Sequence, residues 1–257
     1  MFIPYKDDNP RILIPYVTYA ILAVNVLIFI YQILLTGTVA QHAFTLRFGL
    51  VPAYFWSGDA QAVLEYNREL LSRFYQRALL SDLAEVQLLP RPVTLFTSPF
   101  LHAGWMHIIG NMLFLYVFAD NVEGALGHVR FALFYLLTAL AAGLLHLMVV
   151  PSSMVPVVGA SGAISGVMGG YLVRYPRVRI HVLVFIFIFI TTLRLPATIV
   201  LGMWFLIQAI YGLVSLPMQL SGGVAWFEHI GGFAAGFSYM AISTRGRKFR
   251  FKHGGYF

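Results

Sequence analysis

Long apolar runs are the feature that most constrains what this chain can fold into. A helix needs about 20 mostly apolar residues to cross the hydrocarbon core of a bilayer. Charged residues make up only 11% of the chain, whereas soluble domains carry about 25%. We therefore expect an all-α polytopic membrane protein with a bundle of six transmembrane helices. Five or six runs qualify as spans, at 12–35, 100–119, 129–150, 157–173, 196–216 and 224–243.

A further apolar run at 180–190 is too short to cross the bilayer. It has eleven residues, is rich in β-branched and aromatic types, and is flanked by arginines. A seventh span here would also export the basic C-terminal tail, which the bias of basic residues toward the cytoplasm disfavours. We predict an interfacial or re-entrant segment at this position.

The distribution of positive charge predicts the orientation of the bundle. With six spans, both termini lie on one side, and most basic residues lie there with them. Basic residues collect on the cytoplasmic side, so we predict that the N-terminal segment 1–11 and the basic tail 244–257 are cytoplasmic. The net charge of +7 is then a sign of topology and not of a nucleic-acid partner.

The first outer loop is long, at 36–99, and contains one amphipathic pattern. We expect a helix here that lies on the outer leaflet or packs against the bundle. A surface helix with no role beyond the fold explains the pattern equally well. The apolar residues of the predicted face are Val63, Leu64, Leu70, Leu71, Phe74, Tyr75, Ala78 and Leu79.

Polar side chains occur at a similar depth in three of the spans, close to the outer surface. Polar groups in a membrane are costly and usually face the bundle interior or a water-filled cavity. Because the three sets align in depth, we predict one shared site. Its candidate residues are His102, His107, Asn111, Ser161, Glu228 and His229.

Ser161 and His229 form the candidate reactive pair. A serine becomes a nucleophile when a base takes its proton, and histidine is the usual base. Glycines on both helices would permit the approach, since small residues let helix backbones come close in lipid. These glycines are Gly162 and Gly166 on the fourth span, and Gly232 and Gly236 on the face of the sixth span that carries His229.

His107 and Asn111 are candidate oxyanion donors, because they are four residues apart and share a helical face. Acyl transfer needs donors aimed at the developing negative charge. A histidine N–H, an asparagine amide and the backbone N–H of Ser161 could supply three. Glu228 is adjacent to His229, but neighbouring helical residues point about 100° apart. We therefore favour a Ser–His dyad over a triad.

Each of these residues also has an ordinary structural explanation. A serine among small residues in a span is usually a packing residue, and we interpret Ser165 in this way. A lone histidine in a span is structural as often as functional, and His102 could either orient the outer loop or support the site. The joint occurrence of the serine, the histidines and the asparagine favours a hydrolytic site.

These residues resemble the rhomboid intramembrane serine proteases. The ordered set H-x-x-x-N, G-x-S-G and H-x-x-G-x-x-x-G is far more specific than any one of its parts. With the spacing of the spans, the resemblance covers most of the chain, from about residue 15 to 243. The matching segments are FLHAGWMHIIGNM at 100–112, VEGALGHVRF at 122–131, GASGAISG at 159–166 and EHIGGFAAGF at 228–237.

The resemblance implies a six-helix protease domain at 12–243, with a water-filled cavity open to the outside. It implies that Ser161 is the nucleophile and His229 the base. Members often carry an aromatic residue four positions after the serine, where this chain has Ser165, so another side chain must orient the histidine. The resemblance further implies oxyanion donors at His107 and Asn111 and supporting roles for His102, Gly159, Gly162, Gly232 and Gly236.

The implied substrates are single-span membrane proteins, cleaved near or within their spans at a small residue with helix-destabilising neighbours. No metal or cofactor is implied. The expected partners are these substrates and the lipid bilayer. The expected location is a bacterial plasma membrane, with the site facing outward.

Two other functions compete with this prediction. A non-catalytic rhomboid-like protein would bind membrane clients without cutting them, but such relatives typically lack the serine or the histidine. A metal site is disfavoured, because His102 and His107 are five residues apart and no H-E-x-x-H motif is present. Its ligands would be His102, His107, Glu228 and His229.

Overall fold

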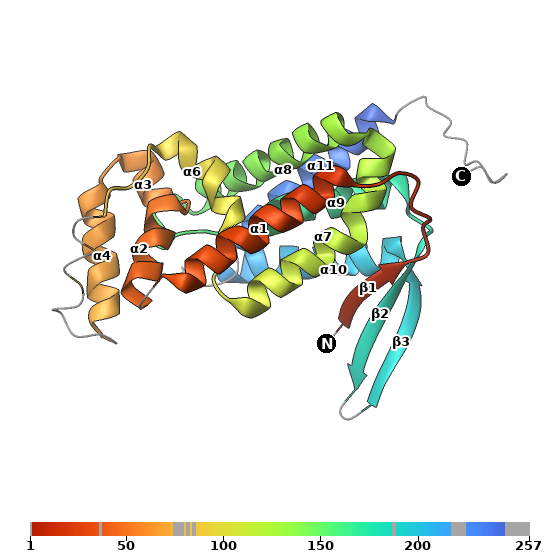
Figure 1. The fold of residues 1–257 in the computed structure, drawn as a ribbon, viewed down its shortest axis with the longest axis horizontal. Coiled ribbons are helices and arrows are strands. Elements are labelled where there is room, and N and C mark those ends of the chain that lie inside the picture. Colours follow the sequence, from red (N-terminus) through yellow and green to blue (C-terminus); the bar gives the residue numbers. More distant parts are fainter. Residues whose placement is uncertain are drawn as a thin grey trace.

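Long helices packed side by side form the body of the molecule, with short helices at one end and a small sheet at the other (Figure 1). The computed structural model describes residues 2–35, 38–73, 80, 83, 86–186, 189–216 and 225–244. The described elements are β1 (Phe2–Asp7), α1 (Tyr16–Leu34), α2 (Thr38–Phe48), α3 (Pro52–Ser57), α4 (Ala60–Ser72), α6 (Arg91–Thr97), η2 (Ser98–Phe100), α7 (Trp105–Leu126), α8 (His128–Val149), α9 (Ser161–Arg174), β2 (Arg179–Ile186), β3 (Phe189–Pro196), α10 (Ala197–Ser215) and α11 (Trp226–Ser243).

Helix α9 lies at the centre of the bundle. All its residues from Gly162 to Tyr171 are buried. Helix α11 packs along it most closely, and α7 and α8 also contact it. Because neighbours surround α9, the polar residue at its start is held away from lipid.

Helices α9 and α11 touch backbone to backbone. A Cβ atom added at Gly232 would lie 1.9 Å from the carbonyl oxygen of Gly162, and one at Gly236 would lie 1.9 Å from that of Gly166. No real Cβ atom approaches an oxygen so closely, so only glycine fits at both positions. The close approach predicted from the glycine spacing is present.

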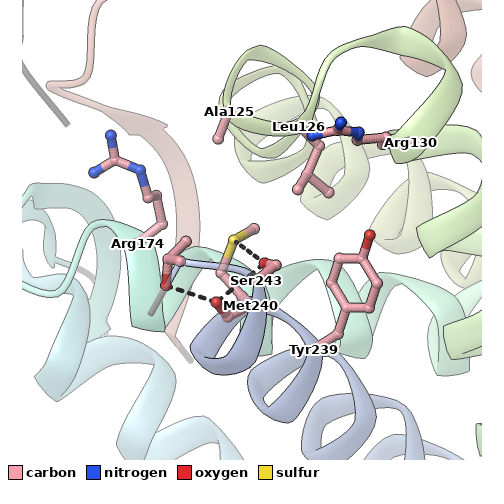
Figure 2. A pocket seen from close by; sticks show the side chains of 8 residues that line it. Ala125, Leu126, Arg130, Arg174, Tyr239, Met240 and Ser243 are labelled. Atoms are coloured by element: carbon pink, nitrogen blue, oxygen red, sulfur yellow. Dashed lines mark hydrogen bonds between the residues drawn. The ribbon is translucent and has the colours of Figure 1, made fainter. Parts of the chain in front are cut away.

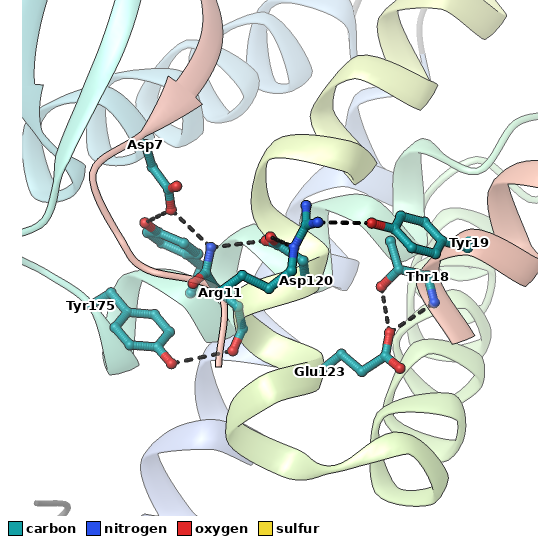
Figure 3. Close-up of polar contacts among 9 residues, drawn as sticks. Asp7, Arg11, Thr18, Tyr19, Asp120, Glu123 and Tyr175 are labelled. Atoms are coloured by element: carbon teal, nitrogen blue, oxygen red, sulfur yellow. Dashed lines mark hydrogen bonds and ion pairs between the residues drawn. The ribbon is translucent and has the colours of Figure 1, made fainter. Parts of the chain in front are cut away.

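The buried carboxylate of Glu123, near the end of α7, holds the start of α1 (Figure 3). It accepts hydrogen bonds from the backbone N–H groups of Val17, at 3.0 Å, and Thr18, at 2.8 Å. The Thr18 hydroxyl donates at 2.6 Å, and Nδ1 of His128 lies at 2.5 Å. A helix start carries unpaired N–H groups and partial positive charge, and a carboxylate satisfies both. This contact joins α1 to the corner between α7 and α8.

The outer segment between α1 and α7 has a small core of its own. Leu46, Val51 and Val63 are buried there, and Leu64 and Leu71 pack against them. The predicted amphipathic face therefore points, within α4, into this cluster. The residues of that face at 74–79 lie outside the described residues.

A three-stranded antiparallel sheet occupies the place of the interfacial or re-entrant segment predicted at 180–190. Strand β2 pairs with β1 on one side and with β3 on the other. The hairpin of β2 and β3 projects from the end of the bundle (Figure 1), and its interfacial or re-entrant placement relative to the bilayer stays a prediction. The β-branched and aromatic composition of the run, typical of strands, was the signal for this structure.

Within the described residues, three helices are long and apolar enough to cross a bilayer: α1, α8 and α10. Helix α7 makes a fourth when it is taken together with α6 and η2, which meet it at a bend of 82°. Helix α9 begins at Ser161, later than the predicted start at 157, and has 14 residues. At 1.5 Å per residue it is shorter than the roughly 30 Å hydrocarbon core. The fold is mostly helical, as predicted. That six helices cross the membrane stays a prediction.

Asp7 connects the sheet to the bundle (Figure 3). The Tyr171 hydroxyl donates to its carboxylate, and Nδ2 of Asn121 donates at 3.0 Å. Burial raises the pKa of Asp7 from 3.8 to about 6; the hydrogen bond from Tyr171 opposes this rise and the charge of Asp120 adds to it. The folded chain therefore holds this proton more tightly than the unfolded chain. The contribution of Asp7 to stability is complete below pH 3.8 and is lost as the pH rises through about 6.

We predict that Gly236→Ala destabilises the bundle, because the new methyl group meets the backbone of Gly166. Overpacking of this kind costs about 1–3 kcal/mol, and thermal unfolding in detergent micelles measures it. The control is Gly202→Ala in α10, where a Cβ atom meets nothing within 4 Å. The control should be neutral or slightly stabilising, since glycine is unfavourable inside a helix. Equal melting temperatures for the two variants would contradict the close contact.

We also predict a pH-dependent difference between the native chain and Asp7→Asn. As the pH rises from about 4 to about 6.5, the native chain should lose stability relative to the variant, because only the native chain gives up a tightly held proton. Melting temperatures measured across this pH range test the prediction. Parallel curves for the two proteins would show that Asp7 does not titrate as the structure indicates.

Candidate active site

Ser161 is the first residue of α9, and the loop before it turns sharply into the helix. Gly159 has a φ of 125°, a conformation that side chains other than glycine rarely adopt. Its N–H donates to the carbonyl of Ser98 at 3.0 Å. Val157 and Leu50 exchange two further backbone hydrogen bonds, at 2.8 and 3.0 Å. The loop that presents the hydroxyl is thus fixed on two sides.

His229 lies next to Ser161. It is the fourth residue of α11, and its Nε2 is 2.8 Å from the Ser161 hydroxyl oxygen. The glycine contacts between α9 and α11 bring the two helices close enough for this bond. The juxtaposition expected from the sequence is therefore present, at a distance suited to direct proton transfer.

The other ring nitrogen of His229 is bonded to Gln208 of α10. Its Nδ1 lies 2.7 Å from the side-chain oxygen Oε1 of Gln208, and both side chains are buried. An amide oxygen can only accept a hydrogen bond, so Nδ1 carries the proton. Nε2 is then left with a lone pair that faces the serine.

Sequence reasoning missed Gln208, and it also missed Trp204, one turn earlier on the same helix. The Trp204 ring lies beside the imidazole, with ring centres 5.6 Å apart. The signal was available, because Gln208 is the only carboxamide in the apolar sequence of α10 and polar groups within spans are costly. Both side chains therefore lie against the imidazole.

Neither Glu228 nor Ser165 is hydrogen-bonded to the imidazole, whose two nitrogens face Gln208 and Ser161. Glu228 is buried, with its Cβ directed toward Gly162, and Gln208 occupies the position that a third acidic member of a triad would take. The Ser165 hydroxyl donates to the backbone carbonyl of Ser161 at 2.6 Å. Its role within α9 is structural, as expected.

His107 and Asn111 pack against the loop before Ser161. A Cβ atom at Gly159 would lie 2.7 Å from Nε2 of His107 and 3.5 Å from Nδ2 of Asn111. Nδ1 of His107 accepts a hydrogen bond from the N–H of Ala103 at 3.3 Å, which places the ring proton on Nε2. Nδ2 of Asn111 is buried and has no hydrogen-bond partner among the described residues. Two donors therefore lie beside the loop that leads to Ser161.

His102 stands behind His107 rather than at the serine. Its backbone N–H donates to Gln32 of α1 at 3.0 Å, and its carbonyl accepts from the same amide at 3.3 Å. Its ring meets the ring of His107 edge to face, with centres 5.2 Å apart. The position is that of a support for the donor.

Within the described part of the chain, no three His, Cys, Asp or Glu side chains gather in a way that could hold a metal ion. The histidines of the site instead lie at two places, with His229 at the serine and His107 at the loop before it. The expectation of a site without a metal or cofactor stays a prediction.

Comparisons with known proteins connect this geometry to a family. The family model described as the rhomboid domain matches residues 90–246. The RHOMBOID-like protein 4 of Arabidopsis thaliana is 32% identical over 143 residues, which are 56% of this chain and 32% of that protein. The chloroplastic Rhomboid-like protein 11 of the same plant is 36% identical over 97 residues, or 38% of this chain and 34% of that protein.

A third relative is named for the absence of activity. Inactive rhomboid protein 1 of Drosophila melanogaster is 33% identical over 78 residues, which are 30% of this chain and 5% of that protein. The matches to the two plant proteins span about a third of the length of each. Similarity to the family alone therefore does not distinguish a protease from a non-catalytic member.

Proposed function

This chain belongs to the rhomboid family, and we propose that it is a serine endopeptidase that cleaves membrane proteins within the bilayer. Members of the family are integral membrane proteins, and the apolar helices fit that location. The observation that carries the proposal is the 2.8 Å contact between the Ser161 hydroxyl and Nε2 of His229.

The proposed reaction begins with attack of the Ser161 oxygen on a peptide carbonyl, while Nε2 of His229 takes the hydroxyl proton. The N–H groups of His107, Asn111 and the Ser161 backbone stabilise the oxyanion that forms. The imidazolium then protonates the leaving amine, the C–N bond breaks, and an acyl-enzyme remains. A water, deprotonated by the same imidazole, releases the acyl group and restores the serine.

Gln208 acts in this proposal as a positioning residue. By accepting a hydrogen bond from the Nδ1–H group, it keeps the Nε2 lone pair aimed at the serine in every cycle. It also stabilises the imidazolium, since its oxygen dipole points at the ring. A carboxylate would do the same with a full charge, whose burial in a membrane protein is costly.

The proposed substrates are single-span membrane proteins. A helical peptide hides its carbonyls in its own hydrogen bonds, so a substrate must unwind before it can react. We propose lateral entry between α7 and α10, which expose large apolar side chains to the lipid. These side chains include Trp105, Met106 and Ile109 on α7 and Met203, Leu206 and Ile210 on α10.

The proposed topology places both termini in the cytoplasm and the site toward the opposite face. The asymmetry of basic residues in the sequence supports it. A bacterial membrane stays a prediction, because the relatives include plant proteins.

The alternative is a non-catalytic member that binds membrane clients. The name of the Drosophila relative shows that the family includes a protein described as inactive. A fluorophosphonate probe reacts with an activated serine and separates the two functions. Labelling that disappears in Ser161→Ala supports the protease. A native chain that remains unlabelled, although thermal melting shows that it is folded, supports the client-binding function.

We predict that Ser161→Ala and His229→Ala each lower cleavage of a co-expressed single-span reporter by roughly 10³-fold or more, because each removes one half of the dyad. Ser238→Ala is the matched control, since Ser238 lies on an exposed part of α11. The control should cut like the native chain. Cleavage that persists at the native rate in either dyad variant would refute the mechanism.

We predict that Gln208→Leu lowers kcat roughly ten- to a hundredfold with little change in KM, because it leaves a buried N–H donor unsatisfied. Gln208→Glu should keep substantial activity and move the acid limb of the pH–rate profile to higher pH, because a carboxylate favours the protonated imidazole. The control is Asn25→Leu, which removes a buried amide that donates to Ile21 within α1. A pH profile of Gln208→Glu identical to the native one would exclude the positioning role.

A further inference from the structure

A groove with an apolar lining lies where α2 meets the end of α1 (Figure 1). Helix α6 and the short helix η2 also contribute to it, and its volume is about 510 Å³. Its lining includes Leu27 and Tyr31 of α1, Phe44 and Phe48 of α2, Phe96 of α6, and Leu101. Pockets that hold small molecules measure roughly 300–1,000 Å³, so the groove is large enough for a ligand.

The lining of this groove favours an apolar ligand. Its exposed atoms are all apolar, and the hydroxyl of Thr97 beside it already donates to the carbonyl of Phe48 at 2.6 Å. Leu101 is 2% exposed and lies at the floor, whereas Leu27 and Phe96 are 64% and 50% exposed and lie at the rim. Removing apolar surface from water is favourable, so an apolar ligand binds here better than a polar one.

A smaller pocket, at the end of the bundle away from the serine, has a different character (Figure 2). Its volume is about 240 Å³, and hydroxyl and guanidinium groups line it. The guanidinium of Arg174 lies over the ring of Tyr175, 5.0 Å from its centre, and is turned away from Arg130. An apolar ligand would remove these polar groups from water at a cost in free energy, so the groove at α1 and α2 is the better site for it.

Arg47 supplies positive charge beside the apolar groove. It is exposed, and its guanidinium carbon lies 5.6 Å from the ring centre of Phe48, which lines the groove. Among the described residues, its guanidinium has no hydrogen bond or ion pair with another side chain. A guanidinium binds phosphate oxygens through parallel N–H donors. A ligand with an anionic head and an apolar tail would therefore match both Arg47 and the groove.

The position of the groove indicates where such a ligand comes from. Helix α1 is long and apolar enough to cross a bilayer, and Leu27 and Tyr31 lie in its second half, at the depth of a single leaflet. Helices α7 and α10, between which we propose that substrates enter, contribute no residue to the lining. A substrate span is therefore not the expected ligand, and the surrounding lipid is.

We propose that the groove holds one acyl chain of an anionic phospholipid, whose phosphate lies at Arg47. The chain contacts Leu27 of α1 and the aromatic rings of α2 and α6, and the guanidinium binds the phosphate oxygens by charge-assisted hydrogen bonds. Bound in this way, the lipid joins the outer segment to the first helix of the bundle. The proposal is independent of whether the serine is catalytic.

The test is native mass spectrometry of the detergent-purified full chain, titrated with each of three lipids. They are long-chain phosphatidylglycerol, phosphatidylcholine with the same acyl chains, and dihexanoyl phosphatidylglycerol. We expect the native chain to retain long-chain phosphatidylglycerol in preference to the other two, because only this lipid has both the anionic head and the long chain.

Two variants with matched controls locate the binding site. Leu27→Asn places an amide at the rim and should weaken retention of long-chain phosphatidylglycerol about fivefold. Its control is Val26→Asn, at an exposed neighbour on α1 that does not line the groove. Arg47→Gln should weaken the same binding about fivefold and leave phosphatidylcholine unaffected. Its control is Arg68→Gln, at an exposed arginine of α4. Both controls should bind as the native chain does.

Several outcomes would overturn the proposal. Equal retention of the two long-chain lipids by the native chain would reject an anionic ligand. Equal retention of the two forms of phosphatidylglycerol would reject an acyl chain in the groove. Undiminished binding in either variant, or an equal loss in its control, would show that the lipid binds elsewhere. Melting temperatures of all variants establish that each protein is folded when it is measured.

Discussion

The contact on which the rest of the structure depends is the backbone-to-backbone approach of α9 and α11. Four glycines permit it, and at two of them a single methyl group would lie 1.9 Å from a carbonyl oxygen of the facing helix. In lipid, helices gain little from burying apolar surface against each other, so close packing and short-range polar contacts must hold them together. The same closeness sets the distance between the two helix starts and therefore the 2.8 Å bond between Ser161 and His229. The glycine contact between α9 and α11 therefore contributes both to the stability of the bundle and to the geometry of the site.

Three polar groups of the site lie near helix starts. Ser161 is the first residue of α9, His107 the third of α7 and His229 the fourth of α11. At a helix start the backbone N–H groups are not used within the helix and the dipole favours negative charge. In the proposed reaction, these helix starts would stabilise the developing oxyanion without a buried cation. The start of α1 has the same unpaired N–H groups, and there the buried carboxylate of Glu123 accepts hydrogen bonds from two of them.

Much of the site could be predicted from the sequence, because its pieces are local patterns. Helical spacing places His107 and Asn111 on one face, and the glycine spacing pairs the two helices that carry Ser161 and His229. The sheet could not be predicted in the same way, since β2 finds its partner in a strand at the far end of the chain. The late start of α9 depends on the loop conformation at Gly159, which a hydropathy pattern does not encode.

Gln208 shows where pattern reading fails for a physical reason. A lone amide in an apolar helix has no partner in its own segment, so only the packing of α10 on α11 reveals that it faces the imidazole. Burying a neutral amide among apolar helices also costs less free energy than burying a carboxylate. An acid in this position would bring a buried negative charge into a site that also holds the buried carboxyl group of Glu228. The amide of Gln208 fixes the tautomer of His229 without adding a charge to the site. In the proposed mechanism, positive charge then appears on the imidazole only during the reaction.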